Sequence, residues 1–132
     1  MELVVNPKLN KNELTELYKS VGWTADVENI DSLRKGLKKS YVIAAYEDKK
    51  LIGLVRALSD YATVVFVQDL LVAPDYQGRR VGKSLMHHLL SYFGSVGQIV
   101  VTAGDDDGRI GKFFRYMNFK EESKHTYEID RR

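Results

Sequence analysis

Hydrophobic residues along this chain follow two periods, and these periods predict a mixture of strands and helices. Short apolar runs predict strands at 2–5, 41–46, 51–58, 62–72 and 98–103. Apolar spacings of three and four predict helices from Asn10 or Asn12 to Gly22, after Asp31, over 81–93 and over about 109–117. Two last short strands are expected at 119–121 and 125–130. The predicted order is β-α-α-β-β-β-α-β-α-β-β, an α+β fold class with a mixed, mostly antiparallel sheet flanked by helices.

The connections between these elements predict how the strands pair. A polar turn at 47–50 joins two strands as a hairpin, and a second turn at 59–61 extends it to an antiparallel meander. The strand at 62–72, the following helix and the strand at 98–103 form one right-handed crossover, so those two strands should lie parallel. The polar segment 104–108, with its three aspartates, is expected to cap the last helix.

Length and composition indicate one soluble domain that spans residues 1–132. Hydrophobic residues make up 44% and charged residues 29% of the chain. No apolar run approaches the roughly 20 residues of a membrane span. The first residues, MELVVNPKLN, lack a signal-peptide pattern, so a cytoplasmic protein is expected. A net charge of +2 argues for neither nucleic acid nor membrane as the main partner.

The residues that bind metals or form disulfides are scarce. The chain has no cysteine, which excludes disulfides, a thiolate nucleophile and a cysteine zinc site. Of the three histidines, His87 and His88 are adjacent on a predicted helix and point about 100° apart. No metal is therefore expected.

The segment Gln77–Ser84, QGRRVGKS, places glycines and cations where a helix begins. Gly78 and Gly82 let the main chain approach a ligand closely, and the first helical turn has N–H groups without intrahelical partners. This combination predicts a site for an anion, and a diphosphate would suit it. A P-loop is excluded because Gln77 stands where its first glycine would be. The alternative interpretation is a simple turn with its cations on a solvated face.

Two motifs resemble those of the GNAT superfamily, the acyl-coenzyme A-dependent N-acyltransferases. Leu71–Gly82, LVAPDYQGRRVG, is similar to the family's apolar-Val pair followed by x-Pro-x-x-Gln/Arg-x-x-Gly-x-Gly/Ala and a helix. Phe113–Phe119, FFRYMNF, resembles its C-terminal Phe-Tyr-x-x-x-Gly-Phe. The resemblance covers nearly all of the chain after about Leu14. It implies the GNAT fold, acetyl-coenzyme A (acetyl-CoA) as co-substrate and a homodimer. The implied reaction is direct acetyl transfer to a primary amine of a small molecule or a protein.

The resemblance also implies where acetyl-CoA binds. Main-chain N–H groups of Arg79–Ser84 would hold the diphosphate, and Leu71 and Val72 would pair with the pantetheine arm in a gap between the strands that end near Val72 and Ala103. The amine would approach from the other side, near Trp23. The expected cofactor-binding residues are Leu71, Val72, Gln77, Gly78, Arg79, Arg80, Val81, Gly82, Lys83, Ser84 and Phe114.

Three positions depart from the family pattern. Arg80 stands where the family usually has the first glycine of Gly-x-Gly/Ala, and Asn118 replaces the glycine after the last helix. Phe114 replaces a tyrosine that in many relatives can protonate the departing thiolate. Tyr116 lies about 200° further around the helix and is no simple substitute. An alternative function is therefore a non-catalytic acyl-CoA-binding or regulatory module.

The group that deprotonates the amine is open at this stage. Gln68 can orient a water, whereas Asp69 can act as a base only if a bulge turns it toward the cleft. The alternative for Asp69 is a buried carboxylate that accepts hydrogen bonds from nearby main chain. Trp23, like Tyr18 and Tyr46, is either a core aromatic or a substrate contact. A nucleic-acid surface built on Arg79, Arg80, Lys83 and the terminal Arg131 and Arg132 is weakly supported, because no aromatic residues interleave with these cations.

Overall fold

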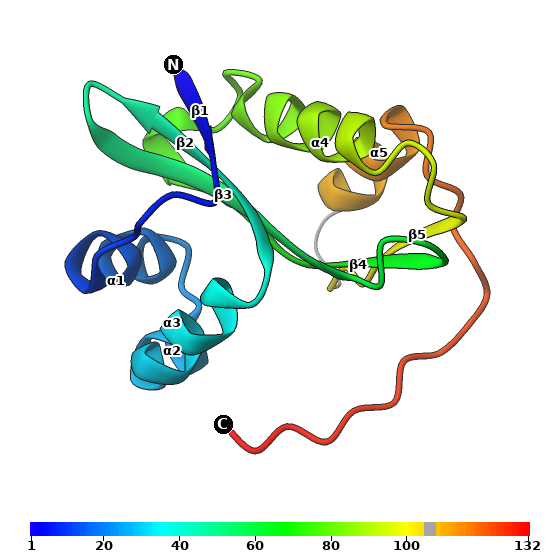
Figure 1. Cartoon of the computed structure of the whole chain (residues 1–132), viewed down its shortest axis with the longest axis horizontal. Coiled ribbons are helices and arrows are strands. Elements are labelled where there is room, and N and C mark those ends of the chain that lie inside the picture. The colour runs from blue at the N-terminus through cyan, green and yellow to red at the C-terminus, as the bar shows by residue number, and fades with distance from the viewer. Residues whose placement is uncertain (105–107) are drawn as a thin grey trace.

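The computed structural model describes residues 1–104 and 108–132, and a five-stranded sheet in the order β1-β2-β3-β4-β5 lies at its centre (Figure 1). The strands are β1 (Glu2–Val5), β2 (Tyr41–Glu47), β3 (Lys50–Ser59), β4 (Val64–Val72) and β5 (Gln98–Val101). The helices are α1 (Lys11–Ser20), α2 (Thr24–Glu28), α3 (Ile30–Lys38), α4 (Val81–Tyr92) and α5 (Arg109–Tyr116). Neighbouring strands from β1 to β4 pair antiparallel, and β4 pairs parallel with β5. The predicted α+β class, the meander and the parallel pair are confirmed.

Helices cover both faces of the sheet. Figure 1 shows α1, α2 and α3 on one face, and α4 with α5 on the other. Each face has its own hydrophobic cluster. Val81, Leu85, Met86 and Leu89 of α4 pack into one cluster, and α1 and α3 supply the other. Both clusters meet on β4, which is therefore buried from two sides.

Local sequence explains two boundaries. The Glu13 N–H donates to the Asn10 side chain at 2.8 Å, and the Glu13 carboxylate accepts from the Asn10 N–H at 3.2 Å. This reciprocal capping box starts α1, so Asn10 rather than Asn12 is the cap. Between β2 and β3, Asp48 and Lys49 have φ of 49° and 68°. Positive φ at both turn residues matches the twist of a tight hairpin.

A β-bulge at Gln68 interrupts β4. The register shift between Val67 and Asp69 leaves Gln68 without a cross-strand partner on β3. In a regular strand, residues three apart face opposite sides. Here Val67 and Leu70 both pack against the α4-side cluster. The inserted residue thus turns Asp69 toward the α1–α3 layer.

The C-terminal strands predicted at 119–121 and 125–130 are wrong for this structure. Residues 119–132 contain neither helix nor strand. They leave α5 and run as an open chain that ends near α2 (Figure 1). Their alternating pattern is real, but a strand also needs the hydrogen-bonding edge of a neighbour. This segment is called the C-terminal arm below.

Two smaller differences concern helices. The segment expected to connect the first two helices contains α2, a helix of 5 residues that buries no side chain fully and so has no apolar stripe to reveal it. The caps expected from Asp105–Asp107 lie outside the described residues. Among residues 1–104 and 108–132, no helix combines the length and apolar character that a membrane crossing requires.

Candidate functional site

The end of β4 has an open edge. β5 pairs with β4 only from Val64 to Val67, so the following residues have no strand on that side in the described part of the chain. On the other side, the Ala73 N–H donates to the Ile52 carbonyl at 2.8 Å. Main-chain groups alternate along a strand, so those of Val72 face the open edge. This edge can accept an extended ligand as an added strand.

A side chain from the following turn holds this strand end. Gln77 donates from Nε2 to the Val72 carbonyl at 2.9 Å. The contact occupies one acceptor and leaves the Val72 N–H directed at the open edge. Gly78, with φ of 78°, then reverses the chain toward α4.

Gly82 brings three elements together. A Cβ atom built at Gly82 would lie 3.8 Å from the Val72 side chain and 3.9 Å from the Phe113 ring. The start of α4, the end of β4 and α5 therefore converge at one point. The open edge of β4 and the N-terminus of α4 form one continuous site.

The N-terminus of α4 presents free donors. The Ser84 N–H makes the first helical bond, to the Arg80 carbonyl at 3.0 Å. Helix geometry leaves the N–H groups of Val81, Gly82 and Lys83 without intrahelical partners, and Arg80 makes no capping bond with its side chain. The helix dipole favours an anion at this end.

Arg80 and its neighbours keep their cations near these donors. Arg80 is exposed and has a left-handed φ of 67°, the conformation that the usual glycine would adopt freely. The Arg79 guanidinium lies 5.4 Å from the centre of the Tyr76 ring. Such a cation–π contact orients an arginine without neutralising it.

Lys83 connects α4 with α5. Its ammonium donates to the Tyr116 hydroxyl at 2.6 Å and lies 4.7 Å from the centre of the ring. The hydrogen bond, together with the charge of Lys83, lowers the pKa of Tyr116. Tyr116 is 64% exposed. Its hydroxyl therefore belongs to the cationic end of the site.

Phe114 lies in an apolar environment. Its ring packs edge-on against Phe113 at 5.2 Å and Phe119 at 5.3 Å between ring centres. The three rings pack against the α4-side cluster. The position where many relatives have a tyrosine thus carries no proton donor, and Tyr116 is engaged elsewhere.

Asp69 forms the polar centre of the opposite face. It is only 5% exposed, and its Oδ2 accepts hydrogen bonds from the Tyr18 hydroxyl at 2.9 Å and from Arg56 Nε at 2.8 Å. The bulge needed to turn Asp69 is present, but the carboxylate is buried, and its partners are side chains rather than main chain. Burial, and then the charge of Asp69, raise the pKa of Tyr18 far above its ordinary value. Tyr18 is consequently a fixed hydrogen-bond donor.

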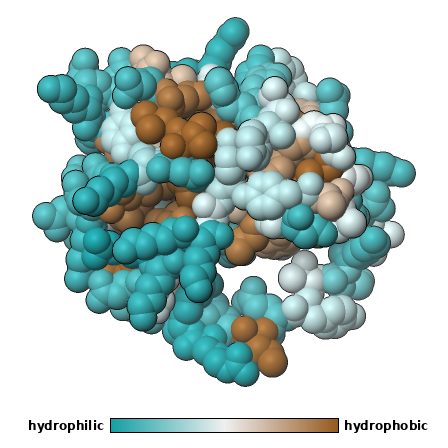
Figure 2. Space-filling view, in the orientation of Figure 1, coloured by the Kyte–Doolittle hydropathy of each residue, from teal (hydrophilic) through white to brown (hydrophobic). Residues whose placement is uncertain are grey.

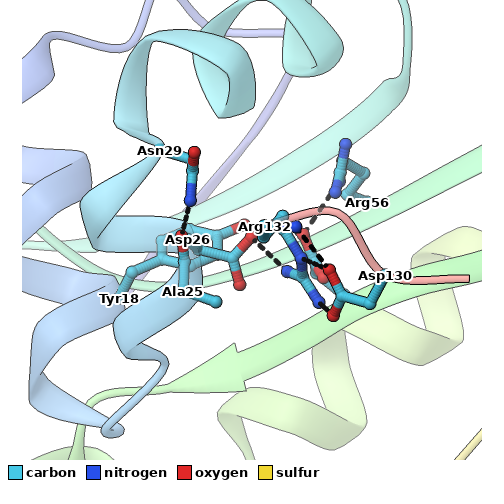
Figure 3. A network of polar contacts seen from close by, with 8 residues as sticks. Tyr18, Ala25, Asp26, Asn29, Arg56, Asp130 and Arg132 are labelled. Atoms are coloured by element: carbon cyan, nitrogen blue, oxygen red, sulfur yellow. Dashed lines mark hydrogen bonds and ion pairs between the residues drawn. The ribbon is translucent and has the colours of Figure 1, made fainter.

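Asp26 of α2 adds a second carboxylate on this face (Figure 3). Burial, followed by the charge of Asp69, raises the pKa of Asp26 above its ordinary value. The Arg132 guanidinium at the end of the C-terminal arm lies 3.1 Å from its Oδ1. The Trp23 ring packs edge-on against Tyr18 at 5.7 Å. Trp23, Asp26 and Asp69 thus surround Tyr18 on the face away from α4.

Gln68 lies at the bulge and is exposed. Pairing with β5 ends at the preceding residue, Val67, so Gln68 stands where the two strands separate. The structure therefore brings the two sequence-predicted catalytic candidates to different places. Gln68 is at the open edge, and Asp69 is within the α1–α3 layer.

Sequence reasoning missed the partners of Asp69. In the sequence, Tyr18 is one of several aromatics in amphipathic segments, and Arg56 stands inside an apolar strand. A charged residue inside the run LIGLVRAL was a usable signal, because a buried arginine needs an anionic partner. Asp26 and Arg132 carried no such signal. In the described residues, no group of three or more His, Asp or Glu side chains is arranged to hold a metal ion.

The profile described as "Acetyltransferase (GNAT) family" matches residues 9–119, from the start of α1 to the end of the Phe113–Phe119 motif. The chain belongs to the GNAT family of acetyltransferases.

Relatives of this GNAT chain support the assignment. It is 32% identical over 122 residues to "Histone acetyltransferase TAP1" of Glycine max, a match that covers 82% of this chain and 51% of the relative. The chain thus spans about half the length of that curated relative.

Solved structures share the GNAT fold along the whole chain. "Acetyltransferase, GNAT family protein SP0256" from Streptococcus pneumoniae TIGR4 matches with 28% identity and a TM-score of 0.83, covering 99% of this chain and 98% of that one. The aminoglycoside N-acetyltransferase AAC(6')-Iy, solved in complex with CoA, matches with 17% identity and a TM-score of 0.70, covering 98% and 95%. At that identity the second match concerns the fold alone.

Proposed function

We propose that this GNAT chain is an N-acetyltransferase that transfers the acetyl group of acetyl-CoA directly to a primary amine of a small molecule or a protein. One observation carries the proposal: the open edge of β4 adjoins the uncapped N-terminus of α4, and Gly82 lies at the junction. An extended pantetheine arm fits the first feature and a diphosphate fits the second.

The cofactor would be held mainly by main-chain groups. The N–H groups of Arg79–Ser84 would bind the diphosphate, and the exposed Arg79 and Arg80 would add charge-assisted bonds to phosphate oxygens. Val72 would hold the pantetheine arm at the open edge through its main-chain N–H, whereas the main-chain groups of the neighbouring Leu71 face β3. Phe114 and its two neighbouring rings would form the apolar wall beside it. Charge and edge geometry together select a ligand with a phosphate end and an extended amide chain.

The acceptor would approach from the α1–α2 side, near Trp23. Asp26 and Asp69 lie on this face, each in an ion pair with an arginine. The ammonium would lose a proton to a water oriented by Gln68. The amine nitrogen would then attack the thioester carbon, and the C–S bond would break as the tetrahedral adduct collapses. The nitrogen would release its second proton to water, and the thiolate would take a proton from water, because Phe114 has none to give.

Phe114 also motivates the second candidate, a non-catalytic acyl-CoA-binding or regulatory module. The burial of Asp69 favours it as well, since its Oδ2 already accepts hydrogen bonds from Tyr18 and Arg56. The two candidates differ in turnover rather than in cofactor binding. A thiol-release assay over a panel of amines separates them.

Titration calorimetry with acetyl-CoA tests the cofactor half of the proposal. The wild type should bind saturably, and Gly82→Trp should bind at least tenfold more weakly. A Cβ at Gly82 makes only ordinary contacts, so Gly82→Ala is the matched control and should change affinity less than threefold. Equal affinity in all three proteins would show that the diphosphate lies elsewhere, and absent binding by the wild type would refute the proposal.

Three broader features stay proposals. We place the protein in the cytoplasm, treat residues 1–132 as one domain and expect a homodimer. Fractionation of cells that express the native protein tests the cytoplasmic location. A single cooperative thermal transition would support one domain. Light scattering after gel filtration tests the homodimer.

A further inference from the structure

A pocket opens on the α1–α3 side of the molecule, between α3 and the loop that joins β1 to α1. Its volume is about 440 Å³, which lies within the range of small-molecule sites. Figure 2 shows hydrophilic side chains over this side of the molecule, with hydrophobic atoms between them. This hollow is called the α3 pocket below, and the argument about it uses six of its lining residues: Lys8, Leu9, Arg34, Leu37, Lys38 and Val42.

Short-range contacts fix the loop wall of the α3 pocket. The Asn6 N–H donates to the Val42 carbonyl at 2.7 Å, and the Asn6 side-chain oxygen accepts from the Val42 N–H at 2.8 Å. Asn6 has a left-handed φ of 48°, a conformation that asparagine adopts more readily than most residues. The capping box at Asn10 fixes the other end of the loop. The pocket is therefore already formed in the folded chain.

The floor of the α3 pocket is apolar. Leu37 and Val42 are buried, and the half-buried Leu9 packs against the same hydrophobic cluster. A floor of this kind gains free energy when it contacts hydrocarbon instead of water. It does not favour a small, fully hydrated ion.

Three cations line the same pocket, on two opposite walls. Lys8 lies on the loop, and Arg34 and Lys38 lie on α3. Within residues 1–104 and 108–132, none of the three forms an ion pair with a carboxylate. Asp31, the acidic residue of α3, lies 3.5 Å from the ammonium of Lys11 instead.

The spacing of these cations favours a bound anion. Arg34 and Lys38 are four residues apart on a helix, so they lie on one face, where like charges repel. Arg34 is also half-buried, so part of its side chain has left water without gaining a carboxylate. An anion in the pocket lowers the repulsion. The planar guanidinium can donate two parallel hydrogen bonds to a carboxylate or a phosphate.

We propose that the α3 pocket binds a small organic anion, with its carboxylate or phosphate held by Lys8, Arg34 and Lys38 and its apolar body lying on Leu9 and Leu37. An inorganic anion would leave the apolar floor in water, and a neutral lipid would leave the cations without a partner. The inference does not rest on the acetyltransferase activity, because none of these residues belongs to the proposed cofactor site.

Titration calorimetry with octanoate tests the requirement for negative charge. The wild type should bind octanoate saturably. Octylammonium, which has the same hydrocarbon length and the opposite charge, should bind at least tenfold more weakly. Octyl phosphate, measured beside octanoate, shows which anionic group the pocket prefers. No saturable binding of either octyl anion at millimolar concentration, or equal affinity for octylammonium, would overturn the proposal.

Substitutions on α3 test where the anion lies. Arg34→Gln should weaken octanoate binding at least tenfold, and Lys38→Gln at least threefold, through lost charge-assisted hydrogen bonds. Lys35→Gln is the matched control, because Lys35 is a cation of the same helix that does not line the pocket. It should change the affinity less than twofold.

Circular dichroism reports whether each of these variants is folded. If Arg34→Gln is unfolded, the exposed Lys38 and Lys35 still provide the comparison. Octanoate affinities that are equal in the folded pocket variants and in Lys35→Gln would refute the assignment.

The N-terminus of α4 offers a second place for an anion, and a further comparison separates the two. Gly82→Trp alters that site and leaves the α3 pocket intact, so it should leave octanoate binding unchanged. Acetyl-CoA should likewise not compete with octanoate. Loss of octanoate binding in folded Gly82→Trp, or competition by acetyl-CoA, would place the anion at α4 and overturn the proposal.

Discussion

The hydroxyl of Tyr18 donates a 2.9 Å hydrogen bond to the carboxylate of Asp69, linking α1 to the bulged strand β4. Arg56 completes the arrangement from β3 with an ion pair of 2.8 Å. The centre of the sheet thus contains a charged pair and a phenol, each satisfied by the others. Removing Asp69 takes the acceptor from both donors, and removing either donor leaves the buried carboxylate with one hydrogen bond fewer.

Tyr18→Phe is therefore expected to destabilise the protein. The substitution keeps the ring that packs against Trp23 and removes only the donor to Asp69. The free energy of unfolding should fall by about 1–3 kcal/mol, measured from urea denaturation. Tyr61→Phe, at an exposed ring, is the matched control and should change it by less than about 0.5 kcal/mol. Equal stabilities of the two variants would mean that Asp69 does not depend on Tyr18.

The raised pKa of Asp26 predicts a pH dependence of stability. A carboxyl with a raised folded-state pKa binds its proton more tightly when folded. Its protonation therefore stabilises the fold fully below the ordinary value near 3.8, and this gain is lost as pH rises through the raised pKa. Asp26→Asn removes the free-energy cost of ionising this carboxyl in the folded protein.

Urea midpoints of Asp26→Asn and the wild type, compared from pH 3 to pH 8, check this sign. The variant should be the more stable protein at pH 7, and its advantage should shrink as pH falls toward 3. Asp31→Asn, a change at an exposed carboxylate, should show a flatter profile. An advantage for Asp26→Asn that grows on acidification would contradict the assigned direction.

Arg80 combines backbone strain with a cation at the proposed diphosphate site. Its left-handed φ of 67° costs a non-glycine residue about 1 kcal/mol. Arg80→Gly should raise stability by up to about 1 kcal/mol, while it weakens acetyl-CoA binding severalfold through the lost charge. Thermal unfolding and calorimetry measure the two effects. Arg79→Gly, where φ is not positive, should weaken binding without any gain in stability.

Phe114→Tyr should restore a proton donor beside the thioester. If direct acetyl transfer occurs, kcat for thiol release should rise about tenfold or more, with KM for acetyl-CoA little changed. Phe113→Tyr, on the adjacent ring, is the control. A fall in kcat with an intact fold would show that the apolar contact with Phe119 matters more than the missing donor.

Much of the fold follows from local patterns in the sequence. The cap of α1, the hairpin and the parallel crossover follow from local patterns of this kind, such as Asn10 with Glu13. The expected start of α3 after Asp31 is wrong, because this helix begins at Ile30. The gathering of glycines and cations at the start of α4 was also predictable, since residues 77–84 are contiguous. Whether they hold acetyl-CoA stays a prediction.

The features that could not be predicted from the sequence depend on pairing between residues far apart in the chain. Gln68 has no local feature that marks it as an inserted residue, because bulges are decided by the register against β3. The link from Tyr18 to Asp69 joins positions 51 residues apart. The strands expected at the C-terminus failed for the same reason: alternation in 125–130 specifies a strand's faces but not its neighbour.

The bulge at Gln68 has a kinetic consequence. It turns Asp69 toward the α1–α3 layer, while the edge of β4 at Val72 remains open. The amine and acetyl-CoA would therefore enter by separate routes. Neither occupant would block the other's entrance, and either could bind first. Initial rates with both concentrations varied should then give intersecting double-reciprocal lines, with desulfo-CoA competitive against acetyl-CoA alone. Parallel lines would instead require a covalent acetyl-protein, for which a chain without cysteine lacks the usual thiol nucleophile.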